Sequence, residues 1–141
     1  MGKGTQCALL AQSFAHKVQH FSAGELLRQA SRADTDQGAL IRDTLKEGGI
    51  IPGEITIGLL REAISSCSAS VALIDGFPRQ INQALQFEEE VSPCNFTLYF
   101  DAPQDLLARR LAHRFESSRL LGKERADDNE ISRAKVLALS V

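Results

Sequence analysis

Two short apolar runs, residues 71–74 and 96–100, constrain the fold of this chain more than any other feature. Each run is free of charge and about as long as a strand, the pattern of strands that are covered on both faces in a parallel sheet. Segments with helical periodicity surround these runs, at residues 5–15, 54–65, 81–91 and 103–115. Strands that alternate with helices predict an α/β fold with a mostly parallel sheet.

The first half of the chain carries further signals for local structure. Residues 18–21 could form a short strand that ends at a functional loop. The sequence from Ser22 to Glu25 has the capping-box arrangement, which predicts a helix over about residues 23–31. Another helix is expected over residues 39–45 and is stopped by Gly48-Gly49. Residues 116–129 are charged and are expected to be a loop.

The overall composition excludes several classes of protein. A chain of 141 residues has room for one domain with a real core. Its formal net charge of −2 gives no general reason to bind nucleic acid or an anionic membrane. No apolar stretch is long enough to span a bilayer and no signal pattern opens the chain, so a cytoplasmic protein is expected. A monomer is also expected. The three cysteines, Cys7, Cys67 and Cys94, favour reduced thiols without a zinc site.

The N-terminal sequence Gly2-Lys3-Gly4-Thr5 precedes a predicted helix. Free backbone N–H groups and the positive end of the helix would face an anion there, and the Lys adds a full charge. These residues resemble the second half of a phosphate-binding loop. Four residues alone are weak evidence, and a flexible terminus is the competing interpretation.

The pentapeptide Asp75-Gly76-Phe77-Pro78-Arg79 is a more specific signal, because it directly follows a predicted buried strand. Ligands of open α/β sheets bind at the carboxyl ends of the strands. An Asp there can hold the water molecules of a Mg²⁺ ion, and Arg79 offers a two-pronged donor for phosphate. The competing interpretation is a simple turn with a surface Arg.

Other polar residues carry little information singly. Arg28 and Gln83 lie on predicted helices, where exposed Arg and Gln side chains are ordinary. Arg114, Arg119 and Arg125, with the sequence 127–129, could close over a transferring phosphoryl group, or they could form a solvated charged linker.

Taken in order, these motifs resemble those of the nucleoside monophosphate kinases, the adenylate kinase and UMP-CMP kinase family. The resemblance covers nearly the whole chain. The segments that carry it are GKGTQ (2–6), FSAGELLR (21–28), IPGEIT (51–56), LIDGFPR (73–79), FDAP (100–103) and RADDN (125–129). It implies phosphoryl transfer from MgATP to a nucleoside monophosphate, giving a nucleoside diphosphate and ADP.

The resemblance also implies roles for individual residues. Lys3, Arg79 and Arg125 would be catalytic. The ATP-binding residues would be Gly2, Lys3, Gly4, Thr5, Arg114 and Arg119, where either of the last two could match the family's first lid Arg. The residues that bind the nucleoside monophosphate would be Ser22, Ala23, Arg28, Gly49, Ile50, Ile51, Gly76, Phe77, Arg79, Gln83 and Arg125. Asp75 would bind Mg²⁺ through water.

The implied architecture is a P-loop three-layer fold with a mostly parallel sheet that lacks the family's first, central strand and its last strand. Residues 1–21 and 53–113 would form the core domain, 22–52 the insert that binds the nucleoside monophosphate, 114–129 a short lid and 130–141 a truncated C-terminal segment. Ala23 favours UMP or CMP as substrate, whereas Gln83 is closer to the adenylate branch. The alternative function is that of a non-catalytic truncated paralogue or splice form that retains at most nucleotide or partner binding.

Overall fold

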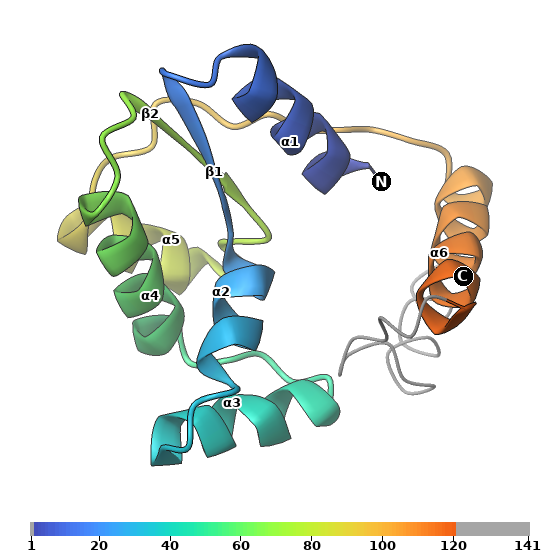
Figure 1. The fold of residues 1–141 in the computed structure, drawn as a ribbon, viewed down its shortest axis with the longest axis horizontal. Coiled ribbons are helices and arrows are strands. Elements are labelled where there is room, and N and C mark those ends of the chain that lie inside the picture. Colours follow the sequence, from blue (N-terminus) through green and yellow to red (C-terminus); the bar gives the residue numbers. More distant parts are fainter. Residues whose placement is uncertain (1, 121–141) are drawn as a thin grey trace.

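A computed structural model of the chain describes residues 2–120, and within that range it contains six helices and two strands. In chain order the elements are α1 (Lys3–Ser13), β1 (Val18–Ser22), α2 (Ala23–Ala30), α3 (Asp36–Lys46), α4 (Gly53–Ser65), β2 (Val71–Asp75), α5 (Ile81–Glu90) and α6 (Gln104–Leu120) (Figure 1). The two strands pair in parallel, with Val18 opposite Val71 and Ser22 opposite Asp75. The predicted α/β class and parallel sheet are therefore confirmed.

The sheet lies between helices, with α1 on one side and α4 and α5 on the other (Figure 1). The main hydrophobic cluster fills the space between the sheet and α4 and α5. Its buried members are Phe21, Ile57, Leu60 and Phe87. Ile74 of β2, which pairs with Phe21, packs against the same cluster. This burial on one face of the strands fixes their register.

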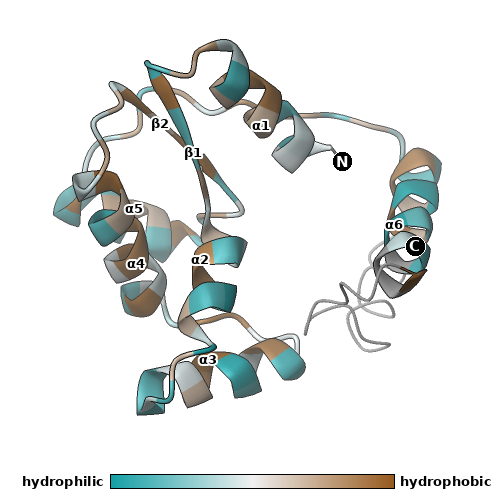
Figure 2. Ribbon diagram, in the orientation of Figure 1, coloured by the Kyte–Doolittle hydropathy of each residue, from teal (hydrophilic) through white to brown (hydrophobic). Residues whose placement is uncertain are grey.

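A second hydrophobic cluster joins α2, α3 and the segment before α4. Its buried residues are Leu27, Ile41 and Ile51. Ile55 and Leu59 of α4 pack against it, whereas Ile57 and Leu60 of the same helix belong to the main cluster. The alternation of apolar and polar residues along α3 and α4 can be followed in Figure 2. Helix α4 therefore lies between the two clusters and contributes to both.

Side-chain caps set the starts of α2 and α3. The Oγ of Ser22 accepts a hydrogen bond from the backbone N–H of Glu25 at 3.4 Å, as the capping-box pattern predicts. The hydroxyl of Thr35 accepts from the N–H of Gly38 at 3.1 Å, so α3 begins at Asp36, before the apolar residues that indicated it. Gly48 follows the end of α3 with a φ of +63°, which confirms the predicted glycine stop.

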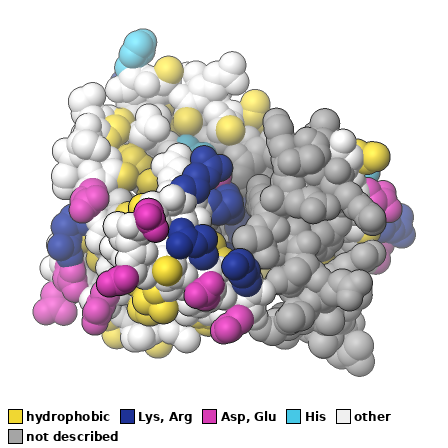
Figure 3. Space-filling model, turned by 60° about the horizontal axis from the view of Figure 1, so that its bottom comes forward, with side chains coloured by type: hydrophobic (Ala, Val, Ile, Leu, Met, Phe, Trp, Pro, Cys, Tyr) yellow, Lys and Arg dark blue, Asp and Glu magenta, His cyan; other side chains and the backbone are white. Residues whose placement is uncertain are grey.

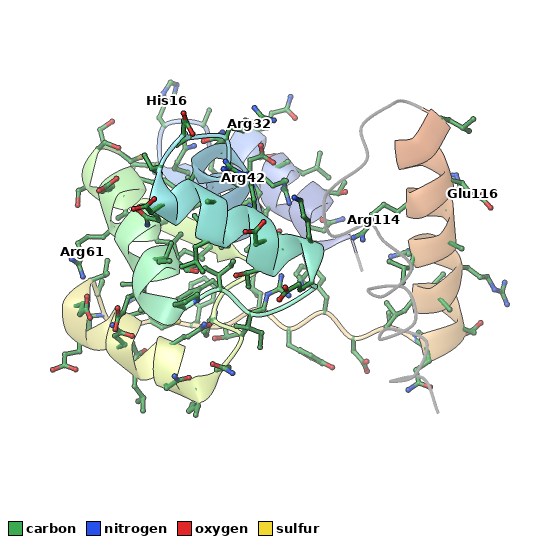
Figure 4. All side chains as sticks on the ribbon, turned by 90° about the horizontal axis from the view of Figure 1, so that it is seen from below. His16, Arg32, Arg42, Arg61, Arg114 and Glu116 are labelled. Atoms are coloured by element: carbon green, nitrogen blue, oxygen red, sulfur yellow. The ribbon has the colours of Figure 1, made fainter. Side chains whose placement is uncertain are left out.

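The connection between α2 and α3 is closely packed around Gly38. A Cβ atom at Gly38 would lie 2.3 Å from the carbonyl oxygen of Ala33 and 3.1 Å from that of Ala30. Arg42 of α3 donates to the carbonyl oxygens of Ser31 and Ala33 in the same turn, and its position on α3 is labelled in Figure 4. The guanidinium of Arg42 therefore stabilises the turn, and the turn can pack this closely because Gly38 has no side chain.

The predicted strand over residues 96–100 is wrong, because these residues join no strand ladder in the described part of the chain. They lie in the irregular connection between α5 and α6 (Figure 1). Phe96, Leu98 and Tyr99 are 67%, 53% and 85% exposed. The apolar composition favours a strand, but a strand also needs a neighbour that accepts its backbone hydrogen bonds.

Two other expectations also differ from the structure. Residues 71–74 form a strand, but its first half is not covered on both faces, since Val71 is 43% exposed and Ala72 is exposed as well. The expected loop over residues 116–129 is wrong for residues 116–120, which continue α6, and residues 121–129 lie outside the described residues. The 3.6-residue periodicity that starts near Pro103 is carried through this charged stretch. None of the helices within residues 2–120 is long and apolar enough to cross a membrane.

Candidate functional site

Two segments that are far apart in the sequence meet at one edge of the sheet. Strands β1 and β2 end side by side, with Ser22 opposite Asp75. Helix α1 begins at the same edge, where a Cβ atom on Gly4 would lie 3.5 Å from Oδ2 of Asp75. The structure therefore brings together the N-terminal glycines and the loop after β2, which the sequence predicted only as separate motifs.

The start of α1 has the features of an anion-binding site. Gly2 precedes the helix with φ +74° and ψ +6°, a left-handed conformation that favours glycine. Its carbonyl oxygen accepts the first helical hydrogen bond, from the N–H of Gln6 at 3.0 Å. No acidic residue lies in the first turn, and Lys3 is the first residue of the helix. The helix dipole and the Lys therefore both favour an anion at this point.

The Asp75 carboxylate lies beside this helix start and is largely enclosed, with 17% of its side chain exposed. The nearest cationic candidate is His20, whose Nε2 lies 4.0 Å from Oδ2 of Asp75, too far for a direct hydrogen bond. Nε2 of His20 is buried and has no hydrogen-bond partner within the described residues. The Asp75 oxygens thus keep their lone pairs available for a donor that the described residues do not supply.

Cys7 lies one turn into α1, and the pKa of its thiol depends on the charges of Asp75 and Lys3. The residue is 7% exposed. Burial raises the pKa of the Cys7 thiol, and the negative charge of Asp75 raises it further, while the positive charge of Lys3 acts in the opposite direction. Both the Lys and the Asp of the candidate site therefore lie close enough to α1 to act on the same thiol.

This raised pKa predicts selective alkylation of the free cysteines. Because the reactive form is the thiolate, we expect iodoacetamide to modify exposed Cys94 well before Cys7 at a pH of about 8. Raising the pH should increase the Cys7 rate only at values above those at which an ordinary thiol ionises. Peptide mass spectrometry over time measures both rates, and unfolding in urea, as the control, should abolish the difference. Equal rates in the folded protein would contradict the prediction.

The loop after β2 turns back toward α2. Gly76 has a φ of +84°, and its Cβ position lies 4.0 Å from the backbone nitrogen of Gly24. The Arg79 guanidinium is exposed, and its Nε donates to the carbonyl oxygen of Gly76 at 3.2 Å. The Phe77 ring is tilted against Phe87 of α5, with ring centroids 5.4 Å apart. The loop is thus anchored in the main cluster while the Arg remains accessible.

Gln83 is not the ordinary exposed helical Gln that the sequence also allowed. It is 3% exposed, and its Oε1 accepts a hydrogen bond from the backbone N–H of Arg79 at 2.9 Å. Its side chain also lies against Gly53, whose Cβ position is 3.2 Å from Cγ of Gln83. Gln83 therefore fixes the backbone at Arg79 and leaves its amide nitrogen as a donor.

Arg28, in the last turn of α2, is a second Arg whose side chain reaches back toward this edge. Nη2 and Nε of Arg28 donate to Oε2 of Glu25 at 2.7 and 3.2 Å. The Arg28 guanidinium also lies near Gly24, whose Cβ position is 3.3 Å from Nη1. Since Gly24 approaches Gly76, the Arg28 side chain and the loop that carries Arg79 lie along one surface. Ala23, the first residue of α2, is buried, with 2% of its surface exposed.

The segment between α3 and α4 has one exposed and one buried apolar residue. Ile50 is 51% exposed, whereas Ile51 is 5% exposed and belongs to the second cluster. The N–H of Gly49 donates to the carbonyl oxygen of Thr44 at 2.9 Å. The Ile51 side chain is therefore buried in the second cluster, and a ligand can contact this residue only through its backbone. The predicted contact of Gly49, Ile50 and Ile51 with a base stays a prediction.

Helix α6 supplies an Arg that sequence reasoning missed. Nη1 of Arg110 lies 3.7 Å from the position that a Cβ on Gly2 would take, so its guanidinium reaches the start of α1. The sequence did contain a signal for Arg110. It precedes Arg114 by four residues, so the two side chains share one face of a helix. Figure 3 shows several Lys and Arg side chains gathered near the middle of one face of the molecule.

Two of the three arginines predicted for the lid, Arg114 and Arg119, lie on α6. Arg114 is exposed, and it lies on the side of α6 that faces the rest of the molecule, with Glu116 on the opposite side (Figure 4). Arg119 is also part of α6, which is described as far as Leu120. Arg125 lies outside the described residues. The described structure thus brings Arg28, Arg79, Asp75 and the start of α1 to one edge, and adds Arg110 to them.

Comparison with known proteins decides the family. A family model described as adenylate kinase matches residues 1–138. The chain belongs to the adenylate kinase family. Among curated proteins, this family member is 44% identical over 132 residues to a uridylate kinase of Saccharomyces cerevisiae, a match that covers 91% of the chain and 61% of the relative.

Two further relatives extend the comparison across the adenylate kinase family. The chain is 39% identical over 130 residues to UMP-CMP kinase 3 of Arabidopsis thaliana, covering 91% of the chain and 59% of the relative. It is 35% identical over 139 residues to adenylate kinase 1 of Drosophila melanogaster, covering 96% and 58%. The matches thus span about three fifths of the length of these relatives. The predicted membership in the nucleoside monophosphate kinases is confirmed.

Proposed function

We propose that this member of the adenylate kinase family transfers a phosphoryl group from MgATP to a nucleoside monophosphate, giving a nucleoside diphosphate and ADP. The observation that carries the proposal is the meeting of α1 and β2, where the Cβ position of Gly4 lies 3.5 Å from Oδ2 of Asp75. A helix start that favours an anion is thereby placed against a carboxylate that favours a hydrated cation. A nucleotide phosphate bound with a metal ion needs both an anion site and a carboxylate.

On the donor side, Gly2, Lys3, Gly4 and Thr5 would hold the ATP phosphates. The backbone N–H groups of the first turn of α1 can donate to phosphate oxygens, and the Lys3 ammonium adds a full positive charge. Arg110 extends this positive region from α6. We further propose that Arg125, with Arg114 or Arg119, acts from a lid over residues 114–129 and neutralises charge on the transferring group.

The described residues fit a Mg²⁺ ion that travels with ATP. Within residues 2–120 no three His, Cys, Asp or Glu side chains gather into a metal cage. A single carboxylate that contacts the waters of the ion is the mode that Mg²⁺ accepts, and Asp75 has no direct hydrogen-bond donor in the described part of the chain. When bound, the ion would neutralise charge on the donor phosphates.

On the acceptor side, Arg28 and Arg79 would bind the phosphate of the nucleoside monophosphate. Both guanidiniums lie along the surface formed by Gly24 and Gly76, and two Arg forks can hold a phosphate in a fixed orientation. Such positioning aligns the acceptor oxygen with the donor phosphoryl group, which supplies much of the rate in this class of reaction. Residues 22–52 would act as the acceptor-binding insert.

We propose UMP or CMP as the preferred acceptor, with AMP next. Ala23 is buried at the start of α2 and offers no hydroxyl group to the base. The names of the relatives include uridylate, UMP-CMP and adenylate kinases, so they support each choice in part. The amide nitrogen of Gln83 is a hydrogen-bond donor, and both kinds of base carry acceptor atoms for such a donor. The pyrimidine preference therefore rests mainly on Ala23.

A narrower function, nucleotide binding without turnover, is favoured by the open sheet. Val71 is 43% exposed and Ala72 is exposed, so the strand that carries Asp75 is supported mainly from the β1 side. A site that transfers phosphate must hold its groups within a fraction of an ångström, whereas a binding site tolerates more movement. Steady-state turnover separates the two functions directly.

The test is a coupled assay of ADP production by the purified chain with MgATP and UMP, CMP or AMP. We expect turnover with UMP and CMP to exceed that with AMP, and we expect Lys3→Ala to lower kcat by about 100-fold, because one charged contact to the transferring group is lost. Lys17→Ala is the matched control, since Lys17 is exposed before β1 and should change kcat little. Turnover that Lys3→Ala leaves intact would contradict the donor role.

A further inference from the structure

Gly53, the first residue of α4, has a helical backbone that other residues could also adopt. The described glycines with a positive φ are Gly2, Gly48 and Gly76, so the backbone conformation at position 53 does not require a glycine. Gly is also less favourable than Ala within a helix. The feature that calls for a glycine at this position is therefore its packing.

The space beside Gly53 is filled by two glutamines of α5. A Cβ atom at Gly53 would lie 3.2 Å from Cγ of Gln83 and 3.9 Å from its Cδ. It would also lie 3.4 Å from Oε1 of Gln86. Two carbon atoms pack best at about 3.5–4.0 Å, so the contact with Cγ is too close. A side chain at position 53 would therefore push first against Gln83.

Both glutamines are held by hydrogen bonds. Oε1 of Gln83 accepts from the backbone N–H of Arg79 at 2.9 Å, and Gln83 is only 3% exposed. Nε2 of Gln86 donates to Oε1 of Glu90 at 2.7 Å, and Oε2 of Glu90 accepts from Arg61 of α4. A displacement of the Gln83 side chain therefore acts on its hydrogen bond to Arg79.

Helices α4 and α5 are also held at a fixed separation. They lie side by side (Figure 1), and both contribute to the main hydrophobic cluster, α4 through Ile57 and Leu60 and α5 through Phe87. Protein interiors are packed almost as densely as organic crystals, so the helices cannot move apart without losing these contacts. The strain of an added Cβ at position 53 would therefore fall on Gln83 and not on the spacing of the helices.

We propose that Gly53 is a positioning residue for the acceptor nucleotide, because the absence of a side chain there lets Gln83 hold the backbone of Arg79 and present its amide to the base. The inference rests on the proposed function, in which Gln83 would contact the acceptor base and Arg79 its phosphate. The two ends of the acceptor then depend on one buried side chain, and Gly53 fixes the place of that side chain from α4.

The first test needs no nucleotide. We expect Gly53→Ala to weaken the hydrogen bond from the N–H of Arg79 to Gln83, so that amide hydrogen exchange at Arg79 becomes about fivefold faster. NMR of the full chain measures this rate. Gly58→Ala is the matched control, because it adds the same methyl group to α4 where nothing lies within 4 Å, and it should leave the rate unchanged. An unchanged rate in Gly53→Ala would overturn the proposal.

The second test measures the steady-state kinetics of the same variants. We expect Gly53→Ala to raise the KM for the nucleoside monophosphate about fivefold, the scale of one weakened hydrogen bond. The KM for MgATP and kcat should change less than about twofold, since Nε of Arg79 is still held by the carbonyl oxygen of Gly76. A purely structural defect would instead lower the amount of active protein, and hence kcat, without changing KM. That result, or an equal rise in KM for Gly58→Ala, would overturn the proposal.

A double-mutant cycle shows whether Gly53 acts through Gln83. Gln83→Ala removes the atoms that a Cβ at position 53 would contact, so adding Gly53→Ala to it should change the acceptor KM less than about twofold further. Adding Gln86→Ala to Gly53→Ala should leave the rise in KM in place, because the contact with Gln83 is the closer one. A cycle in which the two effects simply add, or full rescue by Gln86→Ala, would overturn the proposal.

The two tests separate this proposal from the proposed function. A chain without turnover would contradict the proposed function, whereas the exchange rate at Arg79 would still decide whether Gly53 positions Gln83. A chain that turns over normally, with neither the exchange rate nor the acceptor KM altered by Gly53→Ala, would support the proposed function and overturn the role of Gly53.

Discussion

Replacing Arg79 with Ala is expected to reduce kcat/KM by about 1,000-fold, the scale seen when an Arg that stabilises a transferring phosphoryl group is removed. The reason lies in its geometry. Its Nε is held by the carbonyl oxygen of Gly76 and its backbone N–H by Oε1 of Gln83, so the exposed guanidinium is already oriented. We expect both a higher KM for the nucleoside monophosphate and a lower kcat. Steady-state kinetics with saturating MgATP measures the two terms separately.

The control for Arg79 is Arg32→Ala, since Arg32 is an exposed Arg in the turn between α2 and α3 (labelled in Figure 4). It should change kcat/KM less than about twofold, as expected for an ordinary surface charge. Arg79→Lys should recover only part of the activity, because an ammonium cannot form a two-pronged contact with phosphate. An Arg79→Ala variant with near-normal kinetics would exclude this residue from the acceptor site.

Replacing Gly38 with Ala is expected to lower the free energy of unfolding by about 3 kcal/mol, near the upper end of the range for overpacked sites. The new Cβ would lie 2.3 Å from the carbonyl oxygen of Ala33, a distance that forces the backbone between α2 and α3 to move. That movement also disturbs the carbonyl groups to which Arg42 donates. Urea unfolding followed by circular dichroism measures the change.

Gly58→Ala is the matched control, because it makes the same substitution inside α4. A Cβ at Gly58 would meet nothing within 4 Å. Since Ala is favoured over Gly in a helix interior, we expect this variant to gain about 1 kcal/mol of stability. A loss of stability at Gly58 that matches the loss at Gly38 would show that steric contact is not the cause.

The local structure of the chain could be predicted because its signals act over a few residues. The Ser22 cap, the Gly48 stop and the strand before Asp75 are each decided by neighbours in the sequence. The same holds for the predicted site, since Asp75 and Arg79 follow directly from the end of a strand. Their pattern therefore indicated both the fold class and the family.

The remaining features depend on residues that are distant in the sequence. The strand expected at residues 96–100 fails because its composition cannot show whether a hydrogen-bonding neighbour is present. The burial of Gln83 depends on its packing against Gly53, thirty residues earlier. Arg110 reaches Gly2 across almost the whole described chain. Such contacts are set by the tertiary arrangement, which helical or strand periodicity does not encode.

Helix α4 makes the two halves of the protein energetically dependent on each other. Ile55 and Leu59 support the part that carries Arg28 and Gly49, and the opposite side of the helix supports the strands beneath Asp75. Local unfolding of one half therefore destabilises the other. A nucleotide that stabilises one half would slow amide hydrogen exchange in both. Binding at one of the two proposed substrate sites would therefore be detectable at the other through α4.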